Sequence, residues 1–77
     1  MYPLNKGGFA MIVSAREALY HISHSEQEYE WGLYSKETLR VKLEYFINVL
    51  ASYDYSKAQD ECRRINRKYY FSIEIED

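Results

Sequence analysis

The chain has 77 residues, and its ten Lys and Arg oppose twelve Asp and Glu, which gives a net charge of −2 at pH 7. Domains usually contain about 100 to 150 residues, so this length leaves room for one small domain and not for two. Dedicated nucleic-acid-binding domains carry a clear excess of positive charge, which this chain lacks. Charged residues make up 29% of the sequence and apolar residues 47%, a balance typical of a folded domain rather than a disordered chain.

The single cysteine and the length of the apolar runs bear on localisation. Cys62 has no second cysteine to pair with, whereas secreted domains of this size usually carry several disulfides. We therefore predict the reducing cytoplasm as the compartment. No run reaches the roughly 18 apolar residues that a membrane span requires, and the first ten residues contain no apolar run of signal-peptide length, so we expect no membrane partner.

The N-terminal residues divide into an arm and a first strand. Residues 1–8 contain a proline, an asparagine and a Gly-Gly pair, which favour turns, so we predict a flexible arm followed by a single domain over residues 9–77. Residues 9–13 are apolar at every position, which is typical of a strand covered on both faces.

A first helix and a second strand are expected next. Ser14 and Glu17 match a capping box and predict a helix from residue 15 to about residue 23. A polar patch then breaks the helical spacing, and Tyr29, Trp31 and Leu33 alternate with polar residues or glycine, which indicates a strand with one buried face. A helix that continues to residue 32 is the competing interpretation, because Glu and Gln favour helices.

The clearest element is a helix over residues 36–51, capped by Ser35. Four apolar residues at helical spacing define its main face: Leu39, Leu43, Phe46 and Leu50. Val41, Tyr45 and Val49 widen that face and leave only a narrow polar stripe. The helix is therefore expected to be covered over most of its circumference, either by this domain or by a partner.

The last two elements complete the predicted fold. Ser56 and Gln59 match a second capping box, which predicts a helix that runs to about Arg67. Residues 71–76 alternate apolar and polar side chains, which indicates a final strand. The order strand, helix, strand, helix, helix, strand predicts an α+β fold, a small three-stranded sheet with two to three helices packed on it.

His21 and His24 are the first candidates for chemistry. Together with Glu17 they share one side of the predicted first helix, and Glu26 or Glu28 could add a carboxylate, so a zinc site is conceivable. The spacing does not match a known zinc signature, and histidines on a polar helix face are mostly solvated. We predict no metal and no cofactor.

No catalytic motif is present either. Cys62 falls on the apolar side of the third predicted helix, where a cysteine usually acts as a small inert hydrophobic residue. The Gly-Gly pair lacks the lysine of a phosphate-binding loop, and there is no nucleophile elbow. We therefore predict that the protein is not an enzyme.

One basic cluster supports an alternative function. Four cations lie close together near the end of the third predicted helix: Arg63, Arg64, Arg67 and Lys68. With two following tyrosines they could contact phosphates and stack on bases, as in a nucleic-acid-binding regulator. Cations in a last helical turn also stabilise the helix itself, and acidic neighbours can pair with them. We therefore rank nucleic acid below protein as a partner.

Aromatic content favours protein–protein interaction. Nine tyrosines and one tryptophan exceed what so small an interior can enclose, and Tyr and Trp are enriched at interfaces. We predict that the partner-binding surface includes Trp31, Tyr34, Tyr53 and Tyr55, at or near the connections between elements. The predicted function is that of a non-catalytic regulator or inhibitor, accessory or viral in setting, and a second copy of the chain is one candidate partner.

Overall fold

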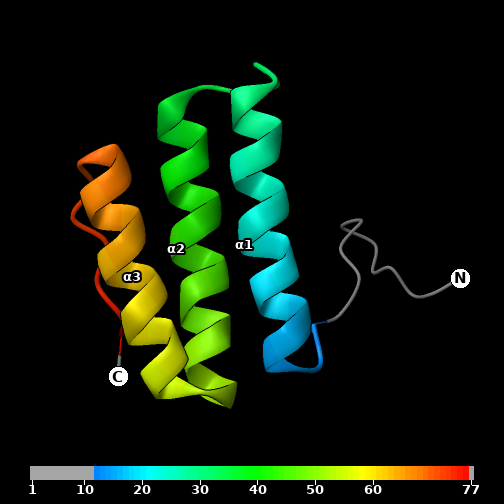
Figure 1. Cartoon of the computed structure of the whole chain (residues 1–77), viewed down its shortest axis with the longest axis vertical. Helices are drawn as coiled ribbons and strands as arrows, with labels where there is room; N and C mark the ends of the chain where they lie inside the picture. The colour runs from blue at the N-terminus through cyan, green and yellow to red at the C-terminus, as the bar shows by residue number, and fades with distance from the viewer. Residues whose placement is uncertain (1–11, 77) are drawn as a thin grey trace, which may run out of the picture.

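The computed structural model describes residues 12–76, which fold into three consecutive antiparallel helices (Figure 1). They are α1 (Ala15–Glu30), α2 (Lys36–Tyr53) and α3 (Tyr55–Tyr69). The middle helix, α2, lies between the other two. Residues 70–76 turn back and run along α3 without forming a further helix. None of the helices in the described range is long and apolar enough to cross a membrane.

The predicted α+β fold is wrong, since no strand occurs within residues 12–76. The alternating segment near residue 30 is instead the end of α1, which continues to Glu30 before a turn. Gly32 stops the helix, because its positive φ of 84° lets the Leu33 N–H reach the Glu28 carbonyl at 3.1 Å and its own N–H reach the Tyr29 carbonyl at 2.9 Å. The competing interpretation of a continuing helix was the better one.

The predicted last strand is also wrong. Residues 71–76 are irregular and form no backbone ladder with another described segment, although Ile73 is buried as the alternation suggested. Of the predicted first strand, residues 9–11 lie outside the described part of the chain, and Ile12 and Val13 precede α1 without strand structure. The predicted arm over residues 1–8 lies outside it too.

Helix caps explain where the three helices begin. The Ser14 hydroxyl accepts a hydrogen bond from the Glu17 N–H at 3.1 Å, and Ser35 caps α2 in the same way at the Thr38 N–H, so both predicted caps are confirmed. The predicted capping box at Ser56 is wrong. Helix α3 begins at Tyr55, two residues earlier than that box predicts, because the Asp54 carboxylate caps it by accepting from the Lys57 N–H at 3.0 Å.

Asp54 thus ends α2 and caps α3, so removal of its side chain should lower the stability of the fold. We expect Asp54→Ala to lower the free energy of unfolding by about 1 kcal/mol, since an N-cap side chain satisfies a backbone N–H that otherwise lacks a partner. Ser56→Ala is the matched control and should have little effect. Thermal unfolding followed by circular dichroism measures both. Equal losses for the two variants would contradict this assignment of the cap.

The hydrophobic core lies along both sides of α2. It combines residues from all three helices with one from the C-terminal segment: Ala18, Ile22, Leu39, Leu43, Phe46, Ile47, Leu50, Ala58, Cys62, Ile65, Tyr69 and Ile73. All four residues predicted to form the main face of the long helix are among them. The middle helix therefore supplies the largest share of the core, as its wide apolar face requires.

Candidate functional site

The four aromatic residues predicted to bind a partner lie at two opposite ends of the bundle. Trp31 and Tyr34 belong to the turn between α1 and α2, whereas Tyr53 and Tyr55 flank the turn between α2 and α3. Eighteen helical residues separate these turns, a length of about 27 Å at 1.5 Å per residue. The structure therefore does not bring the four residues into one contiguous surface.

Two of those tyrosines also hold the fold together through their hydroxyl groups. The Tyr34 hydroxyl donates to the Ser25 carbonyl at 2.8 Å, and the Tyr53 hydroxyl donates to the Ile12 carbonyl at 2.9 Å. Trp31 and Tyr55 are exposed. Tyr53 is as exposed as Tyr55, at 49%, so at that end of the bundle only a hydroxyl group, and not a ring, is engaged within the fold.

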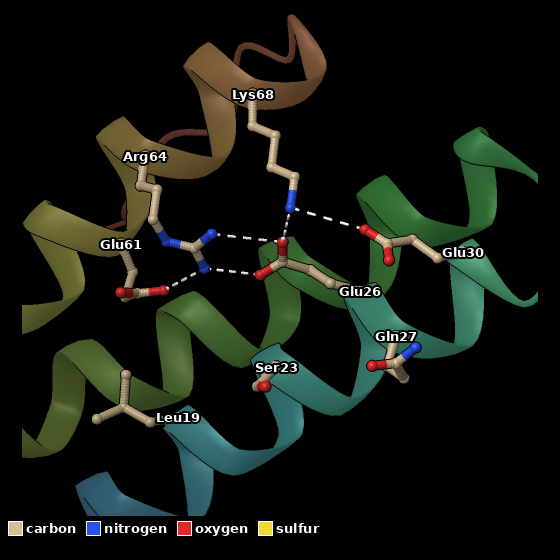
Figure 2. Close-up of a pocket in the computed structure, with 8 residues that line it drawn as sticks. All are labelled: Leu19, Ser23, Glu26, Gln27, Glu30, Glu61, Arg64 and Lys68. Atoms are coloured by element: carbon tan, nitrogen blue, oxygen red, sulfur yellow. Dashed lines mark hydrogen bonds and ion pairs between the residues drawn. The ribbon is translucent and has the colours of Figure 1, made fainter.

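The basic cluster faces a buried carboxylate. Figure 2 shows Arg64 and Lys68 reaching from α3 towards Glu26 on α1. The two guanidinium nitrogens of Arg64 lie 2.6 and 3.3 Å from the two Glu26 oxygens, and Lys68 Nζ lies 3.1 Å from Oε1. The Tyr69 hydroxyl donates to the same oxygen at 2.9 Å. This network joins the two outer helices across α2.

The Glu26 network keeps its members charged. Burial by itself would raise the pKa of Glu26, but the hydrogen bonds from Arg64, Lys68 and Tyr69 outweigh it, so this pKa lies below its usual value. The same contacts raise the pKa of Arg64, which also donates to Glu61 at 2.7 Å. Opposite charges thus stabilise each other in a half-buried setting.

These pairings reduce what the basic cluster can offer to a nucleic acid. Arg64 and Lys68 are shared with Glu26, and Arg63 lies 2.6 Å from Asp60. Only Arg67 has no carboxylate within 4 Å among residues 12–76. A phosphate would have to compete with the chain's own carboxylates at three of the four positions, so the geometry favours the alternative function less than the sequence did.

The histidines belong to an aromatic arrangement rather than to a cluster of ligands. The ring of His21 stacks on Phe46 at 5.0 Å, and that of His24 stacks on Tyr20 at 5.5 Å. His24 also lies 3.2 Å from a Glu28 oxygen. Within the described residues no three His, Cys, Asp or Glu side chains are grouped to hold a metal ion.

Five rings form a continuous cluster over the seam between α1 and α2. Each contacts the next at centroid separations of 5.0 to 5.5 Å, in the order His24, Tyr20, His21, Phe46 and Tyr45. We call this arrangement the five-ring cluster. Edge-on and stacked contacts alternate along it, and both geometries are favourable for aromatic pairs. The rings therefore hold one another in place within the chain.

The five-ring cluster ends on an uncovered part of α2. Val41 and Tyr45 are 53% and 58% exposed, although the helix is apolar at both positions. Together with Lys42 and Phe46 they line a shallow hollow of about 340 Å³. The sequence left open whether the domain itself or a partner covers this side of the helix. No segment of residues 12–76 covers it.

Sequence reasoning missed this surface because it treated the residues separately. The sequence places Tyr45 on the flank of the core stripe, and it presents the two histidines as metal ligands or as solvated residues. A usable signal was present: Tyr20 and His24 are spaced by four residues, and so are Val41 and Tyr45. Such spacing places the two members of each pair next to each other on one helix face.

The thiol of Cys62 is placed as expected for an inert residue. It is buried and its Sγ lies 3.2 Å from the Ile73 carbonyl, to which it donates. Burial raises its pKa, which disfavours the nucleophilic thiolate.

No family model matches the chain, and searches of curated proteins and of solved structures return no match. The surfaces described above are therefore the basis for any statement about function.

Proposed function

We propose that this protein is a non-catalytic recognition domain that binds another protein through the five-ring cluster and the adjoining hollow on α2. The observation that carries the proposal is the exposure of Val41 and Tyr45 beside a run of mutually packed rings. Contiguous apolar patches on the surface of a folded domain usually mark interaction sites, so an apolar helix face left open is more economically explained by a partner than by solvent.

The arrangement suits protein recognition for two physical reasons. Aromatic side chains offer a large contact area for few rotatable bonds, and rings that already pack on one another lose little further freedom on binding. The hollow beside Phe46 can take one apolar side chain, and Lys42 at its edge can pair with a carboxylate next to that side chain. The partner we propose is therefore a protein that presents an apolar residue flanked by an acidic one.

A regulatory or inhibitory role in the cytoplasm remains part of this proposal. Such a role needs only a surface that occludes part of the partner, and a chain of 77 residues can present one. The runner-up, nucleic-acid binding through α3, predicts affinity that falls steeply as salt rises, because released counterions drive such binding. Recognition by the aromatic surface should depend on salt only weakly.

Tyr45→Glu tests the proposal. A charge at the exposed tyrosine of the five-ring cluster should abolish capture of the partner from cells that make the protein, because the binding surface would have to bury an unpaired carboxylate. Tyr55→Glu is the matched control: Tyr55 is also exposed, but it lies in the first turn of α3, where a negative charge is tolerated. Quantitative mass spectrometry of the captured proteins compares wild type with both variants.

Two outcomes would contradict the proposal. Capture that survives Tyr45→Glu would remove the five-ring cluster from the interface. Capture lost only with Tyr55→Glu would move the interface to the turn between α2 and α3.

A further inference from the structure

Two pairs of cations gather around one hollow on α3. Arg63 and Arg67 are four residues apart, so they are neighbours on the helix surface. Arg64 and Lys68 repeat this spacing one residue further along. All four line a hollow of about 390 Å³, which we call the basic hollow, and Asp60 is the one carboxylate among the residues of the described range that line it. The lining is therefore strongly positive, although the whole chain has a net charge of −2.

Arg67 is the cation of the basic hollow that is most available to a ligand. Its side chain is exposed, and no carboxylate lies within 4 Å of it among residues 12–76. A guanidinium group presents its N–H groups in one plane, an arrangement that matches two oxygens of a phosphate group. Arg67 can thus donate to an anion without giving up an ion pair within this part of the chain.

Arg63 can join Arg67 at a small cost. Its partner Asp60 lies 2.6 Å away, but the two side chains are 66% and 67% exposed. Exposed ion pairs contribute little stability, because water and salt screen the two charges and both side chains lose freedom in the pair. An anion with more charge than a single carboxylate should therefore displace Asp60 from Arg63.

Arg64 and Lys68 are already held in place at the basic hollow. Both reach towards Glu26 on α1, with Arg64 at 2.6 Å and Lys68 at 3.1 Å (Figure 2). Glu26 balances part of their charge, so they attract a ligand less strongly than Arg63 and Arg67 do. Because their side chains are fixed by these bonds, they lose little further freedom when an anion approaches.

We propose that the basic hollow binds a compact phosphate group with about two negative charges, such as a phosphate monoester or a diphosphate. Arg63 and Arg67 donate to its oxygens, and Arg64 and Lys68 add positive charge beside them. A nucleic-acid backbone suits the hollow less well, because it carries a single charge per phosphate and spreads these charges along its length. The proposal does not depend on the five-ring cluster.

Titration with inorganic pyrophosphate at constant ionic strength tests the proposal, with the arginine Nε–Hε signals followed by nuclear magnetic resonance. We expect Arg67→Gln to weaken binding by about tenfold or more, because it removes a charge-assisted hydrogen bond. Asp60→Asn should tighten binding by about threefold, because its carboxylate no longer competes for Arg63. Arg16→Gln is the matched control and should leave the affinity unchanged, since Arg16 is also exposed but lies in the first turn of α1, at the opposite end of the bundle (Figure 1).

Three results would overturn the proposal. The first is a wild-type protein that does not bind pyrophosphate, and an oligonucleotide bound by that same protein would make nucleic acid the ligand of α3. The second is equal affinity of Arg67→Gln and Arg16→Gln, which would mean that the anion does not occupy the basic hollow. The third is an Asp60→Asn variant that binds no more tightly than wild type, which would remove Arg63 from the site.

A phosphoserine flanked by glycines distinguishes the two sources of such a phosphate group. Tighter binding of this peptide than of pyrophosphate would support a phosphorylated protein as the ligand, and the reverse would support a free diphosphate. Equal binding of the unphosphorylated peptide would contradict recognition of the phosphate. Tyr45→Glu should leave these affinities unchanged, because Tyr45 does not line the basic hollow, so this proposal and the proposed function fail separately.

Discussion

Leu43→Ala is expected to destabilise the bundle by about 3 kcal/mol, the largest effect we predict for a single substitution. Leu43 lies on the middle helix with no exposed surface, so the truncated side chain leaves a cavity that neighbours on both sides can fill only in part. A chain of this length has a total stability on the order of 0.1 kcal/mol per residue. The variant should therefore unfold some 10 to 20 °C below wild type.

Val41→Ala is the control on the same helix. Val41 is half exposed and touches no segment that covers it within residues 12–76, so its truncation should cost less than about 1 kcal/mol. Urea unfolding measures the loss in free energy of unfolding for both Leu43→Ala and Val41→Ala. Equal losses would mean that the outer side of α2 is buried in the free protein, which would contradict the uncovered surface on which the proposed function rests.

Glu26→Gln is expected to have the second-largest effect on stability, a loss of about 1 to 2 kcal/mol at neutral pH. Removing one partner of a fully buried ion pair costs about 3 to 5 kcal/mol. Solvent screening reduces this value here, because the side chains of Arg64 and Lys68 are 44% and 46% exposed. Both cations also retain a second carboxylate, Glu61 for Arg64 and Glu30 for Lys68.

The loss at Glu26 should depend on pH in a defined direction. The pKa of Glu26 is lower in the folded chain than in the unfolded chain, so its contribution is complete above the unfolded pKa and disappears as the pH falls through the folded pKa. The stability of wild type should therefore converge on that of Glu26→Gln in acid. A difference that stays constant from neutral to acidic pH would show that the carboxylate charge is not what stabilises the network.

Alternating hydrophobicity in two segments predicted strands that the structure does not contain within residues 12–76. In residues 71–76 it correctly marked Ile73 as buried, but the buried side packs against two helices, and asparagine side chains supply the backbone partners. Near residue 30, Trp31 and Leu33 are exposed and only Tyr29 packs against the core, so the alternating residues do not share one buried face. Alternation therefore indicates which side chains share a face and does not establish a neighbouring strand.

Helical periodicity and capping were the informative parts. The apolar spacing of the long helix and its serine cap located α2 to within two residues at its C-terminal end. The predicted first helix is too short, because the polar residues from His24 to Glu28 interrupt the apolar spacing although α1 continues through them. Two of them, Ser25 and Glu26, are in fact buried. Burial of a carboxylate inside a helix depends on cations that follow about 40 residues later, which no local pattern records.

The sequence could predict that aromatic residues would be exposed, but it could not predict which of them lie together. Aromatic excess correctly suggested that rings would remain on the surface, and the wide apolar face of α2 raised the question of what covers it. The packing of α1 against α2 decides which rings meet, so the pairing of His21 with Phe46 could not be inferred from either helix alone.

Photocrosslinking from position 45 tests the central claim most directly. With benzoylphenylalanine in place of Tyr45, irradiation of cells that make the protein should yield a discrete covalent adduct with one partner protein, because position 45 lies at the hollow on α2. The same substitution at Tyr55 should yield none. An adduct at position 55 without one at position 45 would contradict recognition through the five-ring cluster.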